Sequence, residues 1–400
     1  MNLNLTPSLL SGKISAIPSK SMAHRLLICA AFADRDTEIF CPRLSSDITA
    51  SAECLKALGA EIEYDDGVFC VKAITNVKDM AEIDCGESGS TLRFLLPVVC
   101  ALGKGAKIKM HGRLPERPLS PLWEELEAHG CSLSKEGDVL TVGGKLHGGK
   151  FKLRADVSSQ FISGLLFAIP LLEEESEIEL VGNVESAGYI RMTMDALSTF
   201  GVQTEMDGNI LKIKGGKKYI SPVKAVVEGD WSNAAFWYAA NSMGSRIEIT
   251  GLDESSSQGD RKVIEAVNVI TSGDCVIDVK DIPDLVPILS VLASVSKGKT
   301  EFINAGRLRI KESDRIKSVC EIIKSLGGDC TETENGIIIN GVRQLHGGTV
   351  DSVNDHRIAM SAAIAATVCE QSVIVLGAEA VNKSYPDFWK DYESLGGKVK

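Results

Sequence analysis

Carboxylates and cations lie close together at several places in the second half of the sequence. Lys311-Glu312-Ser313-Asp314-Arg315 carries both signs of charge, Asn354-Asp355-His356-Arg357 does so again, and Asp284 follows a proline. A carboxylate or an imidazole among cations can give or take a proton beside a bound anion. We therefore regard Glu312 and Asp284 as candidates for acid–base catalysis, with His356 as a third.

Cations also lie near the expected starts of apolar helices. A cation at a helix N-terminus opposes the helix dipole, so these positions offer no gain in stability to an acidic protein. Forked arginines fit phosphate and carboxylate groups, and a bound small polyanion would explain the pattern. The alternative, that Ser, Asp and Asn at these starts only cap the helices, leaves the cations unexplained. The cations are Lys20, Arg25, Arg93, Arg117, Lys311, Arg315, Arg357 and Lys383.

Small and uncharged residues mark further helix starts. The stretch Gly86-Glu87-Ser88-Gly89-Ser90-Thr91-Leu92-Arg93 can present backbone N–H groups to an anion, and Ser158-Ser159-Gln160 offers three hydrogen-bonding side chains. Gly215-Gly216-Lys217-Lys218 lacks the upstream glycine and the Ser or Thr of a phosphate-binding loop, so we interpret it as a turn.

A repeat positions these residues. An apolar helix, an amphipathic helix that ends in glycine, and a set of strands recur six times, with the glycines at 59, 130, 201, 273, 327 and 396. The apolar helices are expected to begin near Ser21, Ser90, Ser158, Asp230, Asp284 and Asp355.

The fourth and sixth repeats are shortened. The short gap between glycines 273 and 327 predicts that a strand pair is missing, and the sequence stops four residues after Gly396. The alternating segment 2–16 is expected to supply the strands of the sixth repeat. We therefore predict an α/β (α+β) fold of two similar three-repeat domains with buried helices, 19–227 and 1–18 plus 228–400, with the active site in the cleft between them.

The composition of the chain excludes several classes of protein. The chain has 400 residues, 44% hydrophobic and 24% charged, with a net charge of −11, which argues against general binding to nucleic acid or to anionic membranes. No apolar run reaches the roughly 18 residues of a membrane-spanning helix. The 11 cysteines and six histidines lack metal-ligand and redox-pair spacings, so we expect a reduced, cytoplasmic protein without a metal site, and a monomer.

Taken in order, these motifs resemble the 3-phosphoshikimate 1-carboxyvinyltransferases (5-enolpyruvylshikimate-3-phosphate synthases). The shared motifs cover nearly the whole chain, and their joint order and spacing are specific. They are Lys20-Ser21 with Arg25, the glycine stretch ending at Arg93, Glu116-Arg117-Pro118, Ser158-Ser159-Gln160, Glu228-Gly229-Asp230, Ile282-Pro283-Asp284, Lys311 to Arg315, Asn354 to Arg357, and Lys383.

The resemblance implies that the enolpyruvyl group of phosphoenolpyruvate moves to the 5-hydroxyl of 3-phosphoshikimate, with release of phosphate and without a metal or cofactor. It implies that Asp284 is the base, that Glu312 protonates the methylene carbon, and that Lys20 contacts both substrates. Arg93 and His356 are additional candidates. For 3-phosphoshikimate, in the domain 19–227 above all, it implies Lys20, Ser21, Arg25, Ser158, Ser159, Gln160, Ser186, Asp284 and Lys311. For phosphoenolpyruvate it implies Lys20, Gly89, Arg117, Gln160, Arg315, Arg357 and Lys383.

Two departures from the family pattern bear on the site. Glu87-Ser88-Gly89-Ser90 replaces the usual Asn-Ala-Gly-Thr, and Arg307 stands where Asn is frequent. The alternatives are a UDP-N-acetylglucosamine enolpyruvyl transferase, which pairs its early lysine with asparagine and uses a loop cysteine, and a non-catalytic anion-binding protein on the same fold. Ser21 and the absence of cysteine from residues 105–120 argue against the first.

Overall fold

The computed structural model describes residues 1–216 and 218–400, so Lys217, part of the expected turn at 215–218, lies outside the described residues. The chain forms two compact units. We call Pro18–Glu228 the continuous unit, and Met1–Ile17 with Gly229–Lys400 the split unit. Within the described part of the chain, no helix is long and apolar enough to cross a membrane.

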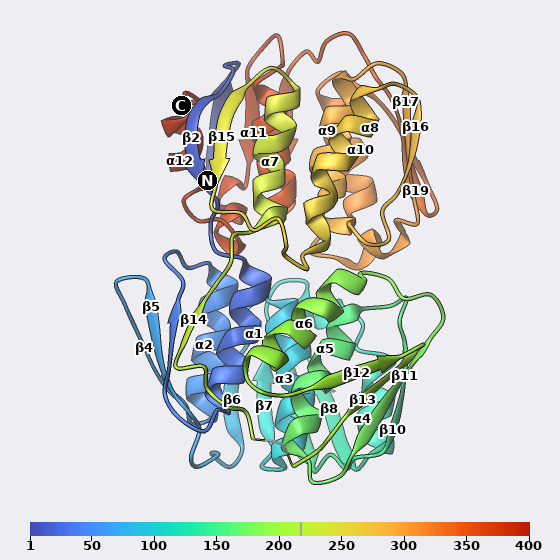
Figure 1. Ribbon diagram of the computed structural model, residues 1–400. Coiled ribbons are helices and arrows are strands. Elements are labelled where there is room, and N and C mark those ends of the chain that lie inside the picture. Colours follow the sequence, from blue (N-terminus) through green and yellow to red (C-terminus); the bar gives the residue numbers. More distant parts are fainter. Residues whose placement is uncertain (217) are drawn as a thin grey trace. The chain divides into compact units, whose positions relative to one another are not determined.

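The continuous unit contains three repeats of two helices and a four-stranded sheet (Figure 1). In each sheet two parallel strands are followed by an antiparallel hairpin, in the orders β14-β3-β5-β4, β6-β7-β9-β8 and β10-β11-β13-β12. The helices are α1 (Lys20–Ala31), α2 (Ser46–Leu58), α3 (Gly89–Leu102), α4 (Leu122–Ala128), α5 (Ser159–Ala168) and α6 (Ala187–Thr199), with the short 3-10 helices η1 (Leu114–Glu116) and η2 (Ile169–Leu171). The strands are β3 (Thr37–Phe40), β4 (Glu61–Asp65), β5 (Val68–Lys72), β6 (Ala81–Asp84), β7 (Ala106–Lys109), β8 (Cys131–Glu136), β9 (Val139–Gly144), β10 (Lys150–Arg154), β11 (Ser176–Val181), β12 (Thr204–Asp207), β13 (Ile210–Ile213) and β14 (Lys224–Val226).

The split unit repeats this plan with both ends of the chain. Its helices are α7 (Trp231–Ser242), α8 (Val263–Thr271), α9 (Val286–Val295), α10 (Arg315–Ser325), α11 (His356–Ala366) and α12 (Phe388–Ser394), with the 3-10 helices η3 (Gly259–Lys262), η4 (Pro283–Leu285), η5 (Gly306–Ile310) and η6 (Ala378–Lys383). Its strands are β1 (Asn2–Thr6), β2 (Ser11–Ser15), β15 (Arg246–Thr250), β16 (Cys275–Asp278), β17 (Lys299–Ile303), β18 (Asp329–Thr333), β19 (Gly336–Asn340), β20 (Gly348–Asp351), β21 (Val373–Leu376) and β22 (Lys398–Val399). They form the sheets β15-β2, β16-β17-β19-β18 and β20-β21-β1-β22.

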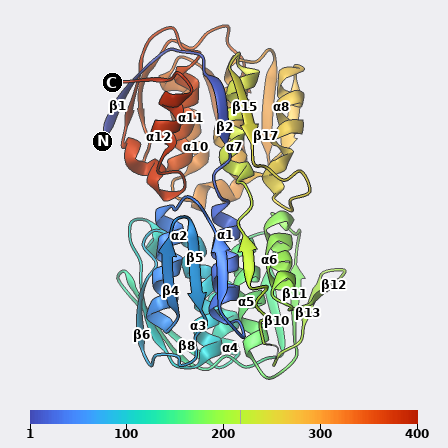
Figure 2. The ribbon, with the colours of Figure 1, turned by 60° about the vertical axis from the view of Figure 1, so that its left-hand side comes forward.

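The N-terminal segment joins two different sheets. β1 lies between β21 and β22 and pairs antiparallel with both, next to the C-terminal segments in Figure 2. The sequence led us to expect β2 in the sheet of the sixth repeat as well, and this prediction is wrong. β2 instead pairs parallel with β15 of the fourth repeat. The two chain ends therefore share one core.

The sheet of the fourth repeat, β15-β2, lacks the antiparallel strand pair that completes each of the other five sheets, as its shortened sequence predicts. The side chain of Asn241 occupies part of the exposed edge, because its Oδ1 accepts from Ile247 N at 2.7 Å and its Nδ2 donates to Ile247 O at 2.9 Å. An amide side chain thus satisfies backbone groups that a further strand would otherwise pair.

The buried helices α1, α3 and α5, and likewise α7, α9 and α11, form the apolar interiors of the two units. Helices that are apolar on all sides are stable only where neighbours cover them. Five of these helices are capped by a side chain that accepts a backbone N–H hydrogen bond: Ser19 for α1, Ser88 for α3, Ser158 for α5, Asp230 for α7 and Asp355 for α11.

The expected starts of the six apolar helices are confirmed to within two residues, and Ser158, Asp230 and Asp355 are themselves the caps. The caps of α1 and α3 lie two residues earlier than Ser21 and Ser90. Asp284 caps no helix, because it lies inside η4, and α9 begins only at Val286.

Candidate active site

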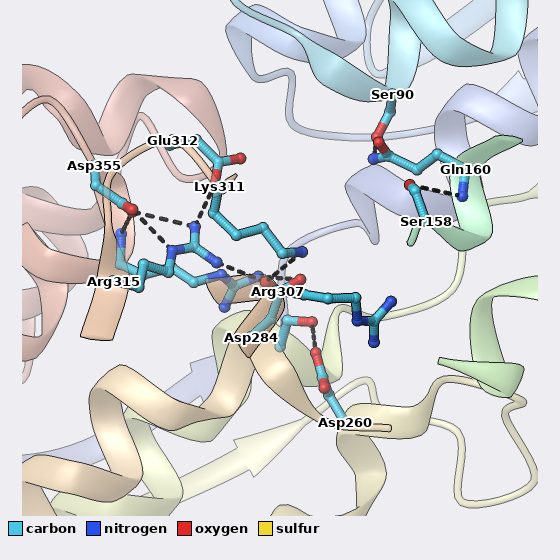
Figure 3. A network of polar contacts seen from close by, with 12 residues as sticks. Ser90, Ser158, Gln160, Asp260, Asp284, Arg307, Lys311, Glu312, Arg315 and Asp355 are labelled. Atoms are coloured by element: carbon cyan, nitrogen blue, oxygen red, sulfur yellow. Dashed lines mark hydrogen bonds and ion pairs between the residues drawn. The ribbon is translucent and has the colours of Figure 1, made fainter. Parts of the chain in front are cut away.

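Arg315, the first residue of α10, lies at the centre of a charge cluster in the split unit (Figure 3). Its side chain is only 1% exposed. Nη1 donates to Asp284 Oδ1 at 2.6 Å, and Nη2 donates to Glu312 Oε2 at 2.8 Å. Nε donates to Asp355 Oδ2 at 2.8 Å. We call Asp284, Lys311, Glu312, Arg315, Asp355 and Arg357 the Arg315 cluster.

The location of Asp284 in a 3-10 turn leaves its carboxylate available to cations. Besides Arg315, Lys311 Nζ lies 3.5 Å from Oδ1 and Arg357 Nη2 lies 3.6 Å from Oδ2. One carboxylate therefore contacts three cationic side chains. The structure therefore brings together the two carboxylates that the sequence singled out, on one guanidinium.

Burial sets the protonation of the cations in this cluster. Desolvation disfavours the charge of Arg315, but Asp355, Glu312 and Asp284 outweigh it and hold the pKa well above its usual value. Desolvation lowers the pKa of Lys311, and Asp284 opposes that effect. Arg315 is thus a permanent cation, whereas Lys311 is the more easily deprotonated of the two.

Asp355 is a member that sequence reasoning missed. It is fully buried, caps α11 by accepting from Arg357 N at 3.0 Å, and accepts from Ser313 Oγ at 3.0 Å. Its two oxygens therefore fix Arg315 relative to α11 and to the loop before α10. An aspartate at a helix start reads as a cap in the sequence, and only the fold shows its second role.

Other predicted residues of the split unit lie at the edges of the cluster. His356 is 2% exposed at the start of α11, with Nδ1 3.9 Å from Asp355 Oδ1. The sequence suggested that Lys383 lies at the start of the last helix. The structure instead places Lys383 at the end of η6, and α12 begins only at Phe388. Lys383 Nζ donates to Asn354 O at 2.6 Å.

A second group of predicted residues meets at the start of α3 in the continuous unit. Arg93 Nη1 donates to Gln160 Oε1 at 3.3 Å, and Gln160 Nε2 donates to Ser90 Oγ at 3.0 Å. A Cβ on Gly89 would lie 2.6 Å from Nη1 of both Arg117 and Arg93, so a larger residue there would displace the two guanidiniums. We call Gly89, Ser90, Arg93, Arg117 and Gln160 the Arg93 cluster.

Arg117 carries positive charge into this cluster without a counter-charge. It follows η1 and does not stand at a helix start, contrary to the expectation from the sequence. Among the residues that the structure describes, no hydrogen bond or ion pair engages its guanidinium, and its Nε is buried. A buried donor without an acceptor is costly, so a bound anion would relieve the cost.

Arg25 is a second cation without a carboxylate partner. Its side chain is buried, and it donates to Thr193 Oγ1 at 2.9 Å, Tyr189 O at 2.8 Å and Ser21 O at 2.5 Å. Burial lowers the pKa of Arg25 to about 10, which leaves it charged at neutral pH. No ion pair neutralises it among the described side chains, so this site also favours an anionic ligand.

The remaining predicted residues of the continuous unit surround Arg25 and the start of α5. Lys20 Nζ lies 2.8 Å from Asp47 Oδ2, a partner that the sequence did not reveal. Ser186 precedes α6 in the left-handed conformation, with φ 56°, and its carbonyl accepts from Tyr189 N at 3.0 Å. Ser158 accepts from Gln160 N at 3.3 Å, and Ser159 is the first residue of α5.

The two groups differ in electrostatics. The Arg315 cluster contains three carboxylates among its cations, whereas Arg25 and Arg117 form no ion pair within the described residues. Proton transfer is thus possible in the split unit, and anion anchoring is favoured in the continuous unit. Across the described residues, no three His, Cys, Asp or Glu side chains are grouped as a metal site.

The chain is similar in sequence and in fold to known proteins. The sequence model of EPSP synthase (3-phosphoshikimate 1-carboxyvinyltransferase) matches residues 5–392. A 3-phosphoshikimate 1-carboxyvinyltransferase of Clostridium perfringens is 43% identical over 419 residues, covering 99% of this chain and 98% of that protein. One from Clostridium kluyveri is 41% identical, covering 99% and 98%. The solved structure of EPSP synthase from Acinetobacter baumannii shares the fold, with a TM-score of 0.82 and 23% identity, covering 100% of this chain and 99% of that one.

Proposed function

The chain belongs to the EPSP synthase family, and we propose that its two residue groups divide one reaction between proton transfer and anion anchoring. The reaction moves the enolpyruvyl group of phosphoenolpyruvate to 3-phosphoshikimate in the shikimate pathway, so the chain is a transferase. The observation that carries the division is the guanidinium of Arg315, which contacts both Asp284 and Glu312.

In the first half of the proposed reaction, the 5-hydroxyl oxygen of 3-phosphoshikimate attacks C2 of phosphoenolpyruvate. Asp284 accepts the hydroxyl proton, and Glu312 donates a proton to the methylene carbon. The product is a tetrahedral intermediate that carries a new methyl group. Because Arg315 holds both carboxylates, the acid and the base face the same reacting molecule.

In the second half, the C2–O bond to phosphate breaks, and the leaving phosphate takes up the proton that Asp284 accepted. The methyl carbon then loses a proton, which restores the double bond. Glu312 is then the base, since it was deprotonated in the first half. Lys311, Arg315, Arg357 and Lys383 would stabilise the charge of the leaving phosphate. Lys311, whose pKa is lowered by burial, is also suited to proton exchange.

Anchoring of 3-phosphoshikimate is assigned to the residues around Arg25, because that buried cation forms no ion pair among the described residues. Ser21, Ser158, Ser159 and Ser186 would complete its hydrogen bonds. Gly89, Arg117 and Gln160 of the Arg93 cluster would hold phosphoenolpyruvate, together with Lys20.

The proposal includes a monomer in a reducing, cytoplasmic compartment. All 11 cysteines are free thiols.

Phosphate release measures the function directly. Purified protein with phosphoenolpyruvate and 3-phosphoshikimate is expected to release phosphate. The same protein with UDP-N-acetylglucosamine as acceptor is expected to release none. Release only with the second acceptor would identify the related enolpyruvyl transferase, and release with neither would contradict catalysis.

A further inference from the structure

Four buried polar side chains form a hydrogen-bonded row through the continuous unit. His24 Nδ1 lies 2.6 Å from Ser51 Oγ, and Ser51 Oγ lies 2.8 Å from Thr91 Oγ1. Thr91 Oγ1 donates to Ser88 Oγ at 2.8 Å. The row thus links α1, α2 and α3, and it ends at Ser88, the cap of α3 beside Gly89.

The direction of the row follows from counting hydrogens, because a hydroxyl group has only one to donate. Thr91 Oγ1 donates its hydrogen to Ser88 Oγ, so it must accept a hydrogen bond from Ser51 Oγ. Because Ser51 Oγ donates its only hydrogen to Thr91, it must accept a hydrogen bond from His24. His24 therefore carries its proton on Nδ1.

The state of His24 agrees with this direction. Burial, together with the charges of Lys20 and Arg25, holds the pKa of His24 well below its usual value, so the ring is neutral. Its Nε2 has no hydrogen-bond partner among the described atoms. With the proton on Nδ1, that buried atom is a bare acceptor rather than an unpaired N–H.

The same count leaves one hydrogen unassigned at the other end of the row. Ser88 Oγ already accepts from Thr91 Oγ1 at 2.8 Å and from Thr91 N at 3.2 Å. Within residues 1–216 and 218–400, no acceptor engages the hydroxyl hydrogen of Ser88, although the side chain is 1% exposed. A buried donor of this kind needs an acceptor.

We propose that Ser88 donates this hydrogen to phosphoenolpyruvate and is a binding residue next to the Arg93 cluster. The inference rests on the proposed function and names a contact that an alanine at this position could not make. The next residue, Gly89, lies against Arg117 and Arg93, so an anion at the start of α3 would meet both the cations and the hydroxyl. Thr91 is a positioning residue, because its Oγ1 and its backbone N–H both donate to Ser88 Oγ and leave the hydroxyl hydrogen for another acceptor.

Capping of α3 is the competing explanation for Ser88. A cap uses the oxygen as an acceptor, so it leaves the role of the hydrogen open. Three substitutions separate the two roles. Ser88→Ala removes both, Ser88→Gly removes the hydroxyl at little cost to the cap, and Ser88→Thr keeps both.

Steady-state kinetics with both substrates test the proposal. Ser88→Ala and Ser88→Gly are each expected to raise the KM for phosphoenolpyruvate by about tenfold or more, the effect of losing a hydrogen bond to a charged group. The KM for 3-phosphoshikimate should stay within about twofold in the same measurements. Ser88→Thr should restore the wild-type KM. Ser51→Ala is the matched control, since it breaks the row one step further from the anion, and it should lower Tm without changing the KM for phosphoenolpyruvate.

Three results would overturn the inference: an unchanged KM in both Ser88→Ala and Ser88→Gly, a failure of Ser88→Thr to restore it, or an equal rise in Ser51→Ala. The turnover of the wild-type protein tests the proposed function separately. Calorimetric titration with phosphoenolpyruvate repeats the comparison without turnover, so an inactive wild-type protein would still leave the Ser88 contact measurable.

Discussion

Arg315 and Glu312 form a 2.8 Å ion pair within one turn of chain, at the start of α10. The cation assigned to phosphoenolpyruvate thus holds the group assigned to protonate it. Because the same guanidinium also binds Asp284 and Asp355, loss of any one carboxylate leaves Arg315 with two others. The roles of the carboxylates can therefore be separated by single substitutions.

Glu312→Gln is expected to abolish most turnover and to leave binding nearly unchanged. The amide keeps the shape of the side chain but has no proton to transfer, so kcat should fall by roughly 10²–10⁴. Saturated rates and calorimetric titration with 3-phosphoshikimate measure the two effects. Glu321→Gln, an exposed change on α10, the helix that follows Glu312, is the control. A kcat close to that of the wild type would remove Glu312 from proton transfer.

Asp284→Asn tests the base. We expect a similar loss of kcat, whereas the affinity for 3-phosphoshikimate should hold or rise, because a negative charge near the phosphate is removed. If Asp284 only balances charge, affinity or Tm should fall and the saturated rate should persist. Asp278→Asn, in the same segment but 37% exposed, is the comparison.

Arg315→Lys tests the need for a forked cation. Lysine retains the charge but cannot contact three carboxylates in one plane, so the buried Asp355 loses part of its hydrogen bonding. We expect a lower Tm and at least about a tenfold rise in the KM for phosphoenolpyruvate. In a double-mutant cycle with Asp355→Asn, the double variant should lose less stability than the sum of the single variants. Additive losses would show that the two side chains act independently.

The sequence predicts a residue's role in the site when that role depends on its neighbours in the chain, and does not when it depends on tertiary contacts. Ser158 and Asp230 are predictable caps, because capping is local. Asp284 is not a cap, because it lies in η4, before α9 begins. Its cationic neighbours Arg315 and Arg357 lie on α10 and α11, which are distant in sequence. Asp355 and Asp47 were missed for the same reason, since a single carboxylate in a polar span gives no sign of its tertiary partner.

The fold shows the same division between local and long-range features. The repeat follows from glycine spacing and apolar helices, which are local patterns. The truncated sixth repeat indicated a borrowed strand, and β1 pairs as expected, but nothing local assigns β2 to β15. Likewise, the pairing of Asn241 with Ile247 compensates for a missing hairpin that the sequence only implies.

Asp260→Asn is expected to change the pH dependence of stability. Asp260 is 3% exposed and accepts a hydrogen bond from Ser232, and burial, together with the charge of Asp284, raises its pKa to about 7. The native state therefore keeps a proton that the unfolded chain loses near pH 4, so this carboxyl lowers stability progressively as pH rises from about 4 to about 7. Asparagine mimics the protonated form. The Tm advantage of the variant should grow between pH 5 and pH 8, and a pH-independent difference would contradict the raised pKa.

Leu5→Ala tests whether the N-terminal strand holds the split unit together. Leu5 is fully buried in β1 and pairs with Val373 of β21 and Val399 of β22, so truncation leaves a cavity between the two ends of the chain. A buried leucine-to-alanine change costs about 2–5 kcal/mol. Leu9→Ala, in the same segment but 54% exposed, should cost far less. Hydrogen exchange should show faster opening of β21 and α11 in Leu5→Ala, with the amides of α3 and α5 protected as in the wild type. Equal losses in the two variants, or faster exchange in α3 and α5, would show that β1 does not stabilise the split unit in this way.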